Sequence, residues 1–382
     1  MELINRGILF VFNKEVKRDI LTFFRKRNIY CEAIKEDTFD KYIEMYNPKF
    51  IIADLKVNLK NEKIDKVKRY NLEEYNELEF EKILNLLEKY DIQKFWNLDY
   101  YIEYATKKIK ESFSDEEIPV LTLSTGVDST VLAILLSNIL DRKIKCINID
   151  TGLNRIIDKE DLQYLRNTYT KLDIEEIDIS DIILKELEGV IEQDKKKDIV
   201  KTFFRETLNR RVEEITENKK YKLVHGTIVT DTFNLFQEND SIIAPLNCLI
   251  KPEVRALGKK FGLKDELTRK LKFPVIGYGR KIIGEINKEK LEKVKEVDYE
   301  FCKQIINKNI DSLEAQYIDV SIIINDNINI MVYRVDRRII DNNVLSYDDC
   351  ISIIRMIEKK FTYIDKSLLD VSNDTDSFLV KR

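Results

Sequence analysis

The sequence predicts an α/β protein whose central part is a doubly wound parallel sheet. Short apolar runs alternate with helical stretches through the middle of the chain, and this alternation is typical of a parallel sheet with helices on both faces. The expected strands are Val120–Leu123, Lys145–Asp150 and Tyr221–Val224, and Val131–Leu140 predicts a buried helix after the first of them. Ligands of such sheets bind at the carboxyl ends of the strands, so the residues that follow each strand are candidate site residues.

Two smaller regions flank this central part. The N-terminal elements predict a small α/β region with a strand at 7–12, a charged helix at about 14–28, a strand at 50–53, and solvated helix and linker at 56–94. The C-terminal elements predict an α+β region with a helix from about 291, β-rich runs at 317–325 and 329–335, and a helix at 347–360. The expected domains are therefore 1–95, 96–302 and 303–382.

Composition excludes several classes of function. Lys and Arg number 65 against 69 Asp and Glu, a net charge of −4, so there is no bulk positive field to hold nucleic acid. The longest apolar run, Val131–Leu136, is too short to span a bilayer, and the N-terminus lacks the pattern of a signal peptide. Five scattered cysteines and one histidine, His225, argue against disulfides, a zinc cage and a multi-histidine metal site. We expect a cytoplasmic protein.

The segment Ser124–Thr130 (STGVDST), between a strand and a helix, is the strongest chemical signal. A small, hydroxyl-rich turn at a helix N-terminus exposes backbone N–H groups that suit a phosphate. Gly126 permits close approach of the backbone, and Asp128 is expected to orient the loop or to help hold Mg²⁺. It is not a Walker A loop, because GK[ST] is missing. The alternative is that Ser and Asp here only cap a helix.

The SxGxDS pattern after a strand resembles the PP-loop of the N-type ATP pyrophosphatases, which cleave ATP between the α- and β-phosphates. Further segments resemble motifs of GMP synthetase, in the same order, over roughly residues 96–303. They are Ile149–Arg155 for VDNGLLR, Gly189–Arg205 for the GV…KRK…F-x-R lid, Gly226–Asp231 for GTIxxD, Pro245–Gly258 for PL…KDEVRxLG, and Phe273–Glu285 for FPGPGL…RIIGE. Motifs in this order are far more specific than any one of them alone.

The resemblance implies an enzyme that uses ATP and Mg²⁺ to adenylate the C2 carbonyl oxygen of XMP and to release pyrophosphate, after which ammonia displaces AMP. Such a site needs a phosphate cradle, a metal ion and positive charge on the leaving group. The implied catalytic residues are Asp128, Lys251, Lys197 and Arg205, and the implied metal ligands are Asp128 and Asp231. The implied nucleotide-binding residues are Ser124, Thr125, Gly126, Val127, Asp128, Ser129, Thr130, Asp150, Gly152, Gly226 and Thr227.

The region before Trp96 resembles the start of the family's class I glutamine amidotransferase domain, but it is much shorter than that domain. The domain needs a nucleophilic cysteine on a glycine-flanked elbow, with a downstream histidine. Here Cys31 lies in YCE, and no histidine precedes His225. A thiol without a neighbouring base is not activated, so we expect an inactive remnant with a packing or docking role. Free ammonia or a separate glutaminase would then supply the nitrogen.

The positions that serve XMP in the family are altered in this chain. No SHHNVGGL loop occurs, since only 232–244 joins the GTI motif to Pro245. The family's SSKPPxTIEWE tail corresponds to Ser372–Arg382, where Asp374 and Asp376 would repel a nucleotide phosphate. Thr125 also stands where the loop usually has glycine. We therefore expect the acceptor to be XMP or, in preference, another XMP-like or small molecule.

Two other functions stay open at this point. A PP-loop sulfur-transfer enzyme would need a reactive cysteine, and Cys146 and Cys248 lie in the right domain, although both read as core residues. A non-catalytic nucleotide-binding protein is the other, and the joint retention of Ser124, Asp128 and Lys251 argues against it. We also expect a homodimer through the C-terminal region, with no membrane partner and no strong signal for nucleic acid.

Overall fold

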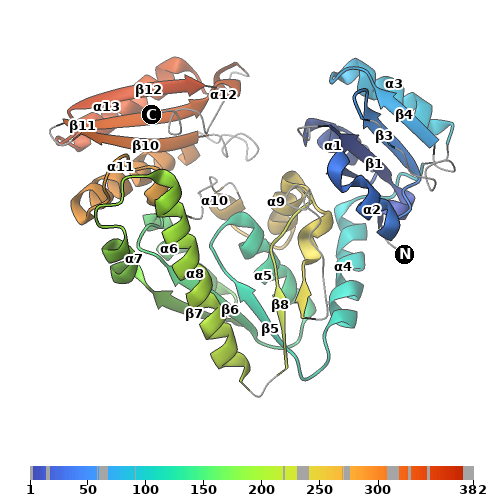
Figure 1. The fold of residues 1–382 in the computed structure, drawn as a ribbon, viewed down its shortest axis with the longest axis horizontal. Coiled ribbons are helices and arrows are strands. Elements are labelled where there is room, and N and C mark those ends of the chain that lie inside the picture. Colours follow the sequence, from blue (N-terminus) through green and yellow to red (C-terminus); the bar gives the residue numbers. More distant parts are fainter. Residues whose placement is uncertain are drawn as a thin grey trace. The chain divides into compact units, whose positions relative to one another are not determined.

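Figure 1 shows the computed structural model as a ribbon. By its internal contacts the chain forms two compact units. The first is Met1–Asp115 with Lys222–Leu257, and the second is Glu116–Tyr221 with Gly258–Arg382. The described residues are 3–13, 18–57, 59, 68–90, 92–217, 220–229, 241–268, 270, 276–307, 318–325, 328–341 and 345–372. The three-domain division expected from the sequence stays a prediction.

The first unit contains a parallel four-stranded sheet in the order β2-β1-β3-β4. Its strands are β1 (Ile8–Phe12), β2 (Cys31–Lys35), β3 (Phe50–Asp54) and β4 (Lys68–Leu72). Its helices are α1 (Arg18–Arg25), α2 (Phe39–Met45) and α3 (Glu77–Glu88). Every residue of β1 is buried, because this strand is paired on both edges, with Ile8 opposite Cys31 on one side and Phe50 on the other. The two apolar strands expected here are confirmed.

The expectation of helix and linker over 56–94 is correct for α3 and wrong for β4. The sequence of β4 is KRYNL, which reads as a charged stretch. Arg69 and Asn71 are exposed, whereas Tyr70 is half-buried and Leu72 is 1% exposed, and both pack against the core of the sheet. β4 is the edge strand of this sheet and pairs with β3 alone. An edge strand can expose one of its faces, so the side chains on that face can be polar. This leaves too few apolar positions for the strand pattern to stand out.

Arg25 at the end of α1 joins several elements of the first unit. Its side chain is 1% exposed, and its guanidinium donates to the carbonyl oxygens of Cys31 at 2.7 Å and Cys248 at 3.0 Å. It also pairs with Glu253 at 3.2 Å, on α9 (Lys251–Lys260). The indole Nε1 of Trp96 donates to the same carboxylate at 2.5 Å. The N-terminal sheet and the start of α9 are thus held through one buried guanidinium.

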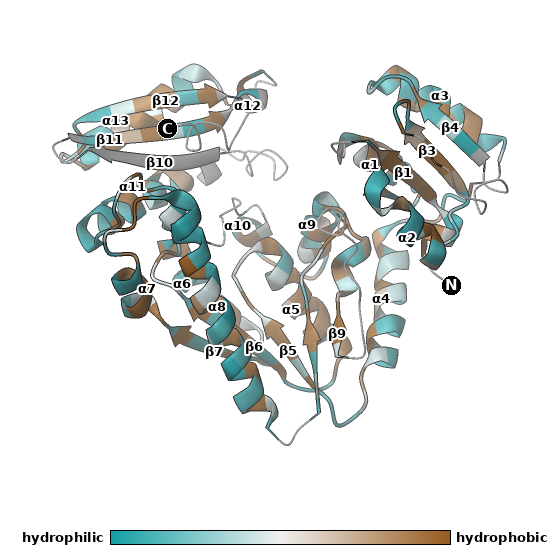
Figure 2. Cartoon of the chain, viewed as in Figure 1, coloured by the Kyte–Doolittle hydropathy of each residue, from teal (hydrophilic) through white to brown (hydrophobic). Residues whose placement is uncertain are grey.

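The second unit begins with parallel strands and the helices that connect them. Its first elements are β5 (Ile118–Thr122), α5 (Val127–Ile139), β6 (Ile144–Asp150), α6 (Ile156–Thr168), β7 (Leu172–Asp178), α7 (Ser180–Glu186) and α8 (Gln193–Thr216). The hydrogen-bonded order of the five-stranded sheet is β7-β6-β5-β8-β9. Its last two strands, β8 (Tyr221–Val224) and β9 (Ile242–Ile243), consist of residues of the first unit except for Tyr221. Figure 2 shows hydrophobic residues along β5, β6 and α5 and hydrophilic residues along most of α8. The parallel α/β fold expected from the sequence is confirmed.

The rest of the second unit is α+β. Its elements are α10 (Asp265–Thr268), α11 (Lys288–Asn307), β10 (Ile318–Asn325), β11 (Ile328–Asp336), α12 (Arg337–Asp341), α13 (Tyr347–Lys360) and β12 (Lys366–Ser372). β11 is central, antiparallel to β10 and parallel to β12. The two strands and the two helices expected here are confirmed, and β12 was not expected.

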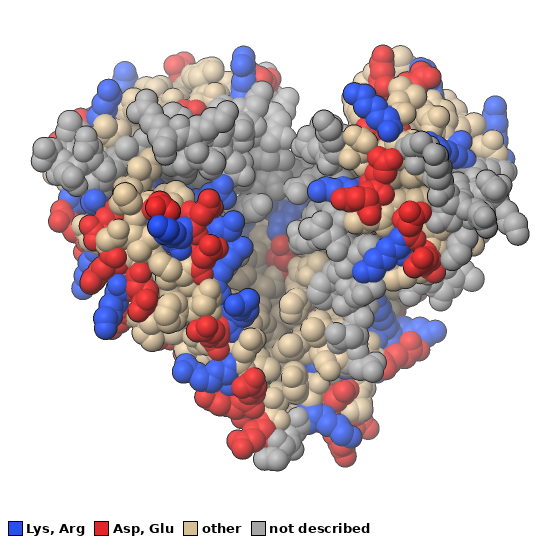
Figure 3. Space-filling model, viewed as in Figure 1, with Lys and Arg blue, Asp and Glu red and all other residues tan. Residues whose placement is uncertain are grey.

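The described surface carries mixed charge. Figure 3 shows Lys and Arg interspersed with Asp and Glu over the visible face, in keeping with the near-neutral net charge. Within the described ranges, the search for a helix long and apolar enough to cross a bilayer finds none.

We predict that Arg25→Met destabilises the first unit by about 3–5 kcal/mol, because Glu253, whose side chain is only 14% exposed, loses its guanidinium partner. Urea unfolding followed by Trp96 fluorescence measures this directly, since Trp96 is the only tryptophan and contacts the same carboxylate. The control is Arg27→Met, whose ion pair with Glu81 is exposed and should contribute at most about 1 kcal/mol. Equal midpoints for the two variants would contradict the role given to Arg25.

Candidate functional site

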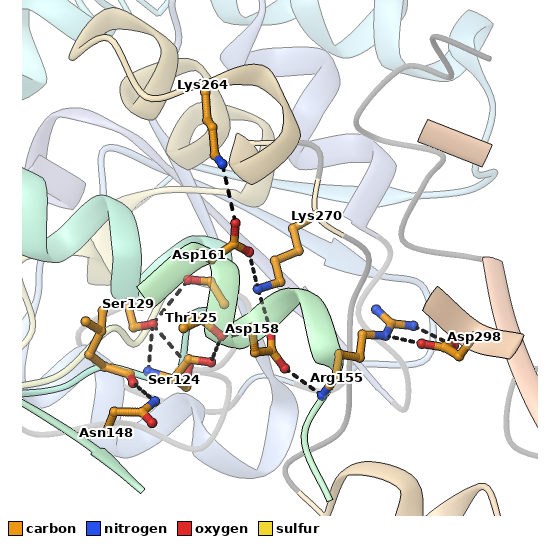
Figure 4. Close-up of polar contacts among 12 residues, drawn as sticks. Ser124, Thr125, Ser129, Asn148, Arg155, Asp158, Asp161, Lys264, Lys270 and Asp298 are labelled. Carbon is orange, nitrogen blue, oxygen red and sulfur yellow. Dashed lines mark hydrogen bonds and ion pairs between the residues drawn. The ribbon is translucent and has the colours of Figure 1, made fainter. Parts of the chain in front are cut away.

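The segment Ser124–Thr130 forms the turn between β5 and α5, at the carboxyl end of a parallel strand (Figure 4). Two hydrogen bonds fix the point where the turn leaves the sheet. The backbone N–H of Leu123 donates to the carbonyl of Ile147 at 2.9 Å, and the Asn148 side chain donates to the carbonyl of Leu123 at 2.7 Å. Both partners belong to β6, so the turn is tied to the neighbouring strand at its first residue.

Ser129 closes the turn onto the first turn of α5. Its hydroxyl accepts from the backbone N–H of Ser124 at 3.2 Å, donates to the carbonyl of Gly126 at 3.1 Å, and lies 3.0 Å from the Ser124 hydroxyl. A Cβ at Gly126 would lie 3.3 Å from the Ser124 Oγ, so the turn is tight at this glycine. Ser124 itself is exposed. The turn therefore holds one accessible hydroxyl against a rigid backbone.

The middle of the helix behind the turn, residues 131–136, is entirely apolar. Residues 131–136 of α5 are 0% exposed, so the helix is anchored in the core of the unit and its N-terminus cannot shift freely. The N–H groups of its first turn have no partner within the helix, and the helix dipole places partial positive charge there. Val127 and Thr130 are buried, and the N–H of Thr130 already donates to the carbonyl of Gly126 at 3.0 Å, so of these two only Val127 can offer a ligand its backbone N–H. An anion is the ligand that this geometry favours.

Asp128 is the expected metal ligand that the structure describes. It is half-buried in the first turn of α5. Mg²⁺ is usually held by one or two carboxylates together with substrate phosphates, so a single carboxylate beside a phosphate turn fits this ion. The described ranges contain no group of three or more His, Cys, Asp or Glu that could hold a metal by itself. Asp231, the second expected ligand, falls in 230–240, outside the described residues.

A polar network that was not expected from the sequence lies beneath the turn. The Thr125 hydroxyl lies 2.8 Å from Asp158 Oδ1, and the ammonium of Lys270 lies 2.5 Å from the same carboxylate oxygen. Lys270 also pairs with Asp161 at 2.7 Å, one helical turn further along α6 (Figure 4). Neither Asp158 nor Lys270 belongs to the motifs that the sequence resembles, and only the tertiary structure brings them together.

Asp150 and Gly152 shape the turn after β6. Asp150 accepts from the backbone N–H of Gly152 at 2.8 Å and pairs with Lys159 at 3.0 Å. Gly152 has a φ of +75°, and a Cβ there would lie 2.6 Å from the Cβ of Ser180, so only glycine fits. These contacts give the two residues a structural role, and their expected role in nucleotide binding stays a prediction.

The lid segment lies at the N-terminal half of α8. Lys197 and Arg205, the expected catalytic cations, are exposed. The neighbouring Lys196 is fully buried and donates to the carbonyl oxygens of Ile282 at 2.9 Å and Gly284 at 2.6 Å. Its burial lowers the pKa of Lys196 to about 8. Of the three successive lysines, the middle one is structural, Lys195 pairs with Glu192 at 3.0 Å, and Lys197 is exposed.

The remaining candidates belong to the first unit. Gly226 and Thr227 follow β8 and are half-buried, and Lys251 is the first residue of α9 and is also half-buried. Glu253, held by Arg25, accepts from the backbone N–H of Ile250 at 2.9 Å. The start of α9, where Lys251 lies, is therefore fixed within this unit.

The cysteines proposed for sulfur transfer are core residues. Cys146 on β6 is 0% exposed and Cys248 is 5% exposed. Burial raises the pKa of Cys146 to about 12 and also raises the pKa of Cys248. A thiol of this kind is protonated at neutral pH and is a poor nucleophile.

Comparison with known proteins identifies the central part of the chain. The family model described as NAD synthase matches residues 98–319, more than half of the chain. Among curated proteins, the GMP synthase [glutamine-hydrolyzing] of Mesoplasma florum is 30% identical over 250 residues, covering 59% of this chain and 48% of that protein. The corresponding enzyme of Bacillus subtilis is 30% identical over 243 residues, covering 59% and 47%. The chain thus spans about half the length of the curated relatives it matches.

Two solved structures also align with this chain. The NH3-dependent NAD synthetase from Campylobacter jejuni has 18% identity and a TM-score of 0.36, with 45% of this chain and 75% of that chain covered. The NMN synthetase from Francisella tularensis has 12% identity and a TM-score of 0.39, with 69% and 94% covered.

These findings confirm the coarser of the two resemblances seen in the sequence. Residues 98–319 are an NAD synthase-like PP-loop ATP pyrophosphatase domain, whereas the likeness to GMP synthase is distant and partial. Relatives such as NAD synthase and GMP synthase are ATP-dependent amide-forming ligases. On the strength of the match over more than half of its length, the chain belongs to the NAD synthase family.

Proposed function

We propose that this protein adenylates a carbonyl oxygen of a small-molecule acceptor at the expense of ATP, and that ammonia then displaces AMP. The observation that supports this most directly is the turn at Ser124–Thr130, a hydroxyl-lined anion cradle on a buried helix, found in a PP-loop ATP pyrophosphatase domain. The acceptor would be an XMP-like or other small molecule, with XMP itself the family alternative.

The chemistry has two steps. The acceptor oxygen attacks the α-phosphorus of ATP, a P–O bond forms, and the bond from that phosphorus to the bridging oxygen breaks, which releases pyrophosphate. Ammonia then attacks the activated carbon, the C–O bond to AMP breaks, and the nitrogen loses a proton to solvent. The cradle of Ser124, Ser129 and the N-terminus of α5 would stabilise the charge of the departing pyrophosphate. Mg²⁺ at Asp128 would neutralise part of the same charge.

Lys251, Lys197 and Arg205 would add positive charge around the phosphates. The exposure of Lys197 and Arg205 on α8 suits a role in which they meet the nucleotide only when it is bound. Asp231 would be the second metal ligand. The C-terminal sheet of β10, β11 and β12 would carry a homodimer contact.

The nitrogen would come from free ammonia or from a separate glutaminase. Cys31, the cysteine of the amidotransferase-like region, is 0% exposed, and its thiol donates to the carbonyl of Leu21. Burial raises the pKa of Cys31 to about 12. A glutaminase nucleophile must be accessible and ionised, so this region would not hydrolyse glutamine. The same argument at Cys146 and Cys248 disfavours sulfur transfer.

The first prediction for this function concerns the ATP half-reaction. Asp128→Asn should weaken binding of ATP in the presence of Mg²⁺ by about 10-fold or more, because a neutral amide is a poorer ligand for this ion than a carboxylate. Calorimetry measures the affinity, and pyrophosphate release with XMP and ammonium, then with other candidate acceptors, measures turnover. The control is Asp141→Asn, since Asp141 follows the other end of α5 and its side chain is fully exposed. If the unaltered protein bound no ATP, the proposed function would be wrong.

A second prediction concerns the nitrogen source. Ammonium should support AMP release, whereas glutamine at the same concentration should not, because the only cysteine positioned in the amidotransferase-like region is buried. Mass spectrometry of the aminated product and a glutamate assay measure the two activities. Cys31→Ser should leave the ammonium-dependent rate within about 3-fold. Glutamate production that disappears in this variant would overturn the assignment.

A third prediction separates nitrogen transfer from sulfur transfer. All five cysteines are buried, so none should be alkylated by iodoacetamide in the folded protein, and all five should be alkylated after denaturation. Peptide mass spectrometry resolves the individual positions. Stoichiometric labelling of Cys146 or Cys248 in the folded protein would restore the sulfur-transfer hypothesis.

A further inference from the structure

The phosphate turn contains a residue in an unfavourable conformation. Thr125 has a φ of +56°, in the left-handed region where β-branched residues are rare. Glycine takes this conformation without steric cost, and it is the usual residue at this position of a PP-loop. Thr125 is also 1% exposed, so its hydroxyl must find a partner inside the protein. Something in the surrounding structure must hold this residue in place.

Asp158 supplies that support. The hydroxyl of Thr125 lies 2.8 Å from Asp158 Oδ1 and 2.6 Å from the carbonyl oxygen of Ser124, so its single proton lies between two acceptors. Asp158 is the third residue of α6, and its Oδ2 accepts from the backbone N–H of Arg155 at 2.9 Å, which caps the helix. The carboxylate is therefore fixed by its own helix and extends to the turn from a rigid position.

Lys270 offsets the charge of this carboxylate. Its ammonium lies 2.5 Å from Asp158 and 2.7 Å from Asp161, and the Lys270 and Asp158 side chains are 8% and 15% exposed. Lys264 lies 3.7 Å from Asp161 as well, so two cations face two carboxylates along α6 (Figure 4). Without these cations, a carboxylate directly beneath a turn that binds phosphate would repel the ligand.

We propose that Asp158, neutralised by Lys270, is a positioning residue that keeps Thr125 in its left-handed conformation and thereby holds the phosphate turn ready for ATP. Glycine at position 125 would adopt this conformation without support, whereas threonine is held in it by the hydrogen bond to Asp158. The proposal rests on the proposed function where its readout is ATP affinity. Asp158 acts through Thr125, with no contact to the nucleotide required.

The test compares Asp158→Asn in two backgrounds, the natural sequence and Thr125→Gly. In the natural background, the variant should raise the KM for ATP by about 10-fold and change kcat by less than about 2-fold, because the turn is displaced while the reacting groups are kept. In the Thr125→Gly background, the same substitution should raise the KM by less than about 3-fold, because glycine needs no support there. A carboxylate with a merely structural role would change the KM equally in both backgrounds.

Asp161→Asn is the matched control. Asp161 binds the same Lys270 but, among the described residues, has no hydrogen bond or ion pair with the turn, so its loss should change the KM for ATP by less than about 3-fold. An equal effect of Asp158→Asn in both backgrounds, or no effect in the natural one, would overturn the proposal. If the natural protein bound no ATP, the proposed function would be wrong. The midpoint of thermal unfolding would then still test whether Asp158 positions Thr125. Asp158→Asn should then lower the midpoint about twice as far with Thr125 as with Thr125→Gly, and equal shifts would refute it.

Discussion

The anchoring of α5 in the core is the constraint on which the candidate site depends. A turn can bind an anion only if its N–H groups already point the same way, and a helix whose residues 131–136 are fully buried cannot rotate to adapt. The bonds from Asn148 to the turn and from Ser129 back to Gly126 then leave few conformations open between strand and helix. The ordered conformation of this turn is stabilised from the core, where apolar burial outweighs the entropic cost of an ordered turn.

The sequence predicted those features that arise from local apolar patterns. The strands at 8–12, 144–150 and 328–336 are continuous apolar or alternating runs, and the helix at 347–360 has a clear helical period. β4 was missed because an edge strand with a polar face offers only Tyr70 and Leu72 as a pattern. Lys196 was missed for another reason. Three successive lysines look alike in sequence, and only the rotation of α8 against the segment at 282–284 decides which one is buried.

In the N-terminal region, Cys31 is a core residue and not an accessible thiol. The cysteine of the YCE segment lies on a strand of the core, and the space around its backbone is occupied by a buried guanidinium. The carbonyl oxygens of Cys31 and Cys248 both accept from Arg25, which joins the region to the start of α9. Within the first unit, the N-terminal sheet is thereby fixed to the helix that carries Lys251.

The Thr125 turn shows why part of the site lies beyond sequence reasoning. Reading the loop alone, threonine in place of glycine counts as a departure that weakens the motif. The compensating groups lie 33 residues away at Asp158 and in a separate segment at Lys270, so no local pattern connects them. A left-handed threonine costs about 1–3 kcal/mol, and a charge-assisted hydrogen bond returns about 1.5–3 kcal/mol, so the two effects are comparable. The substitution is therefore tolerated only together with the carboxylate, and the two positions act as one unit of the phosphate turn.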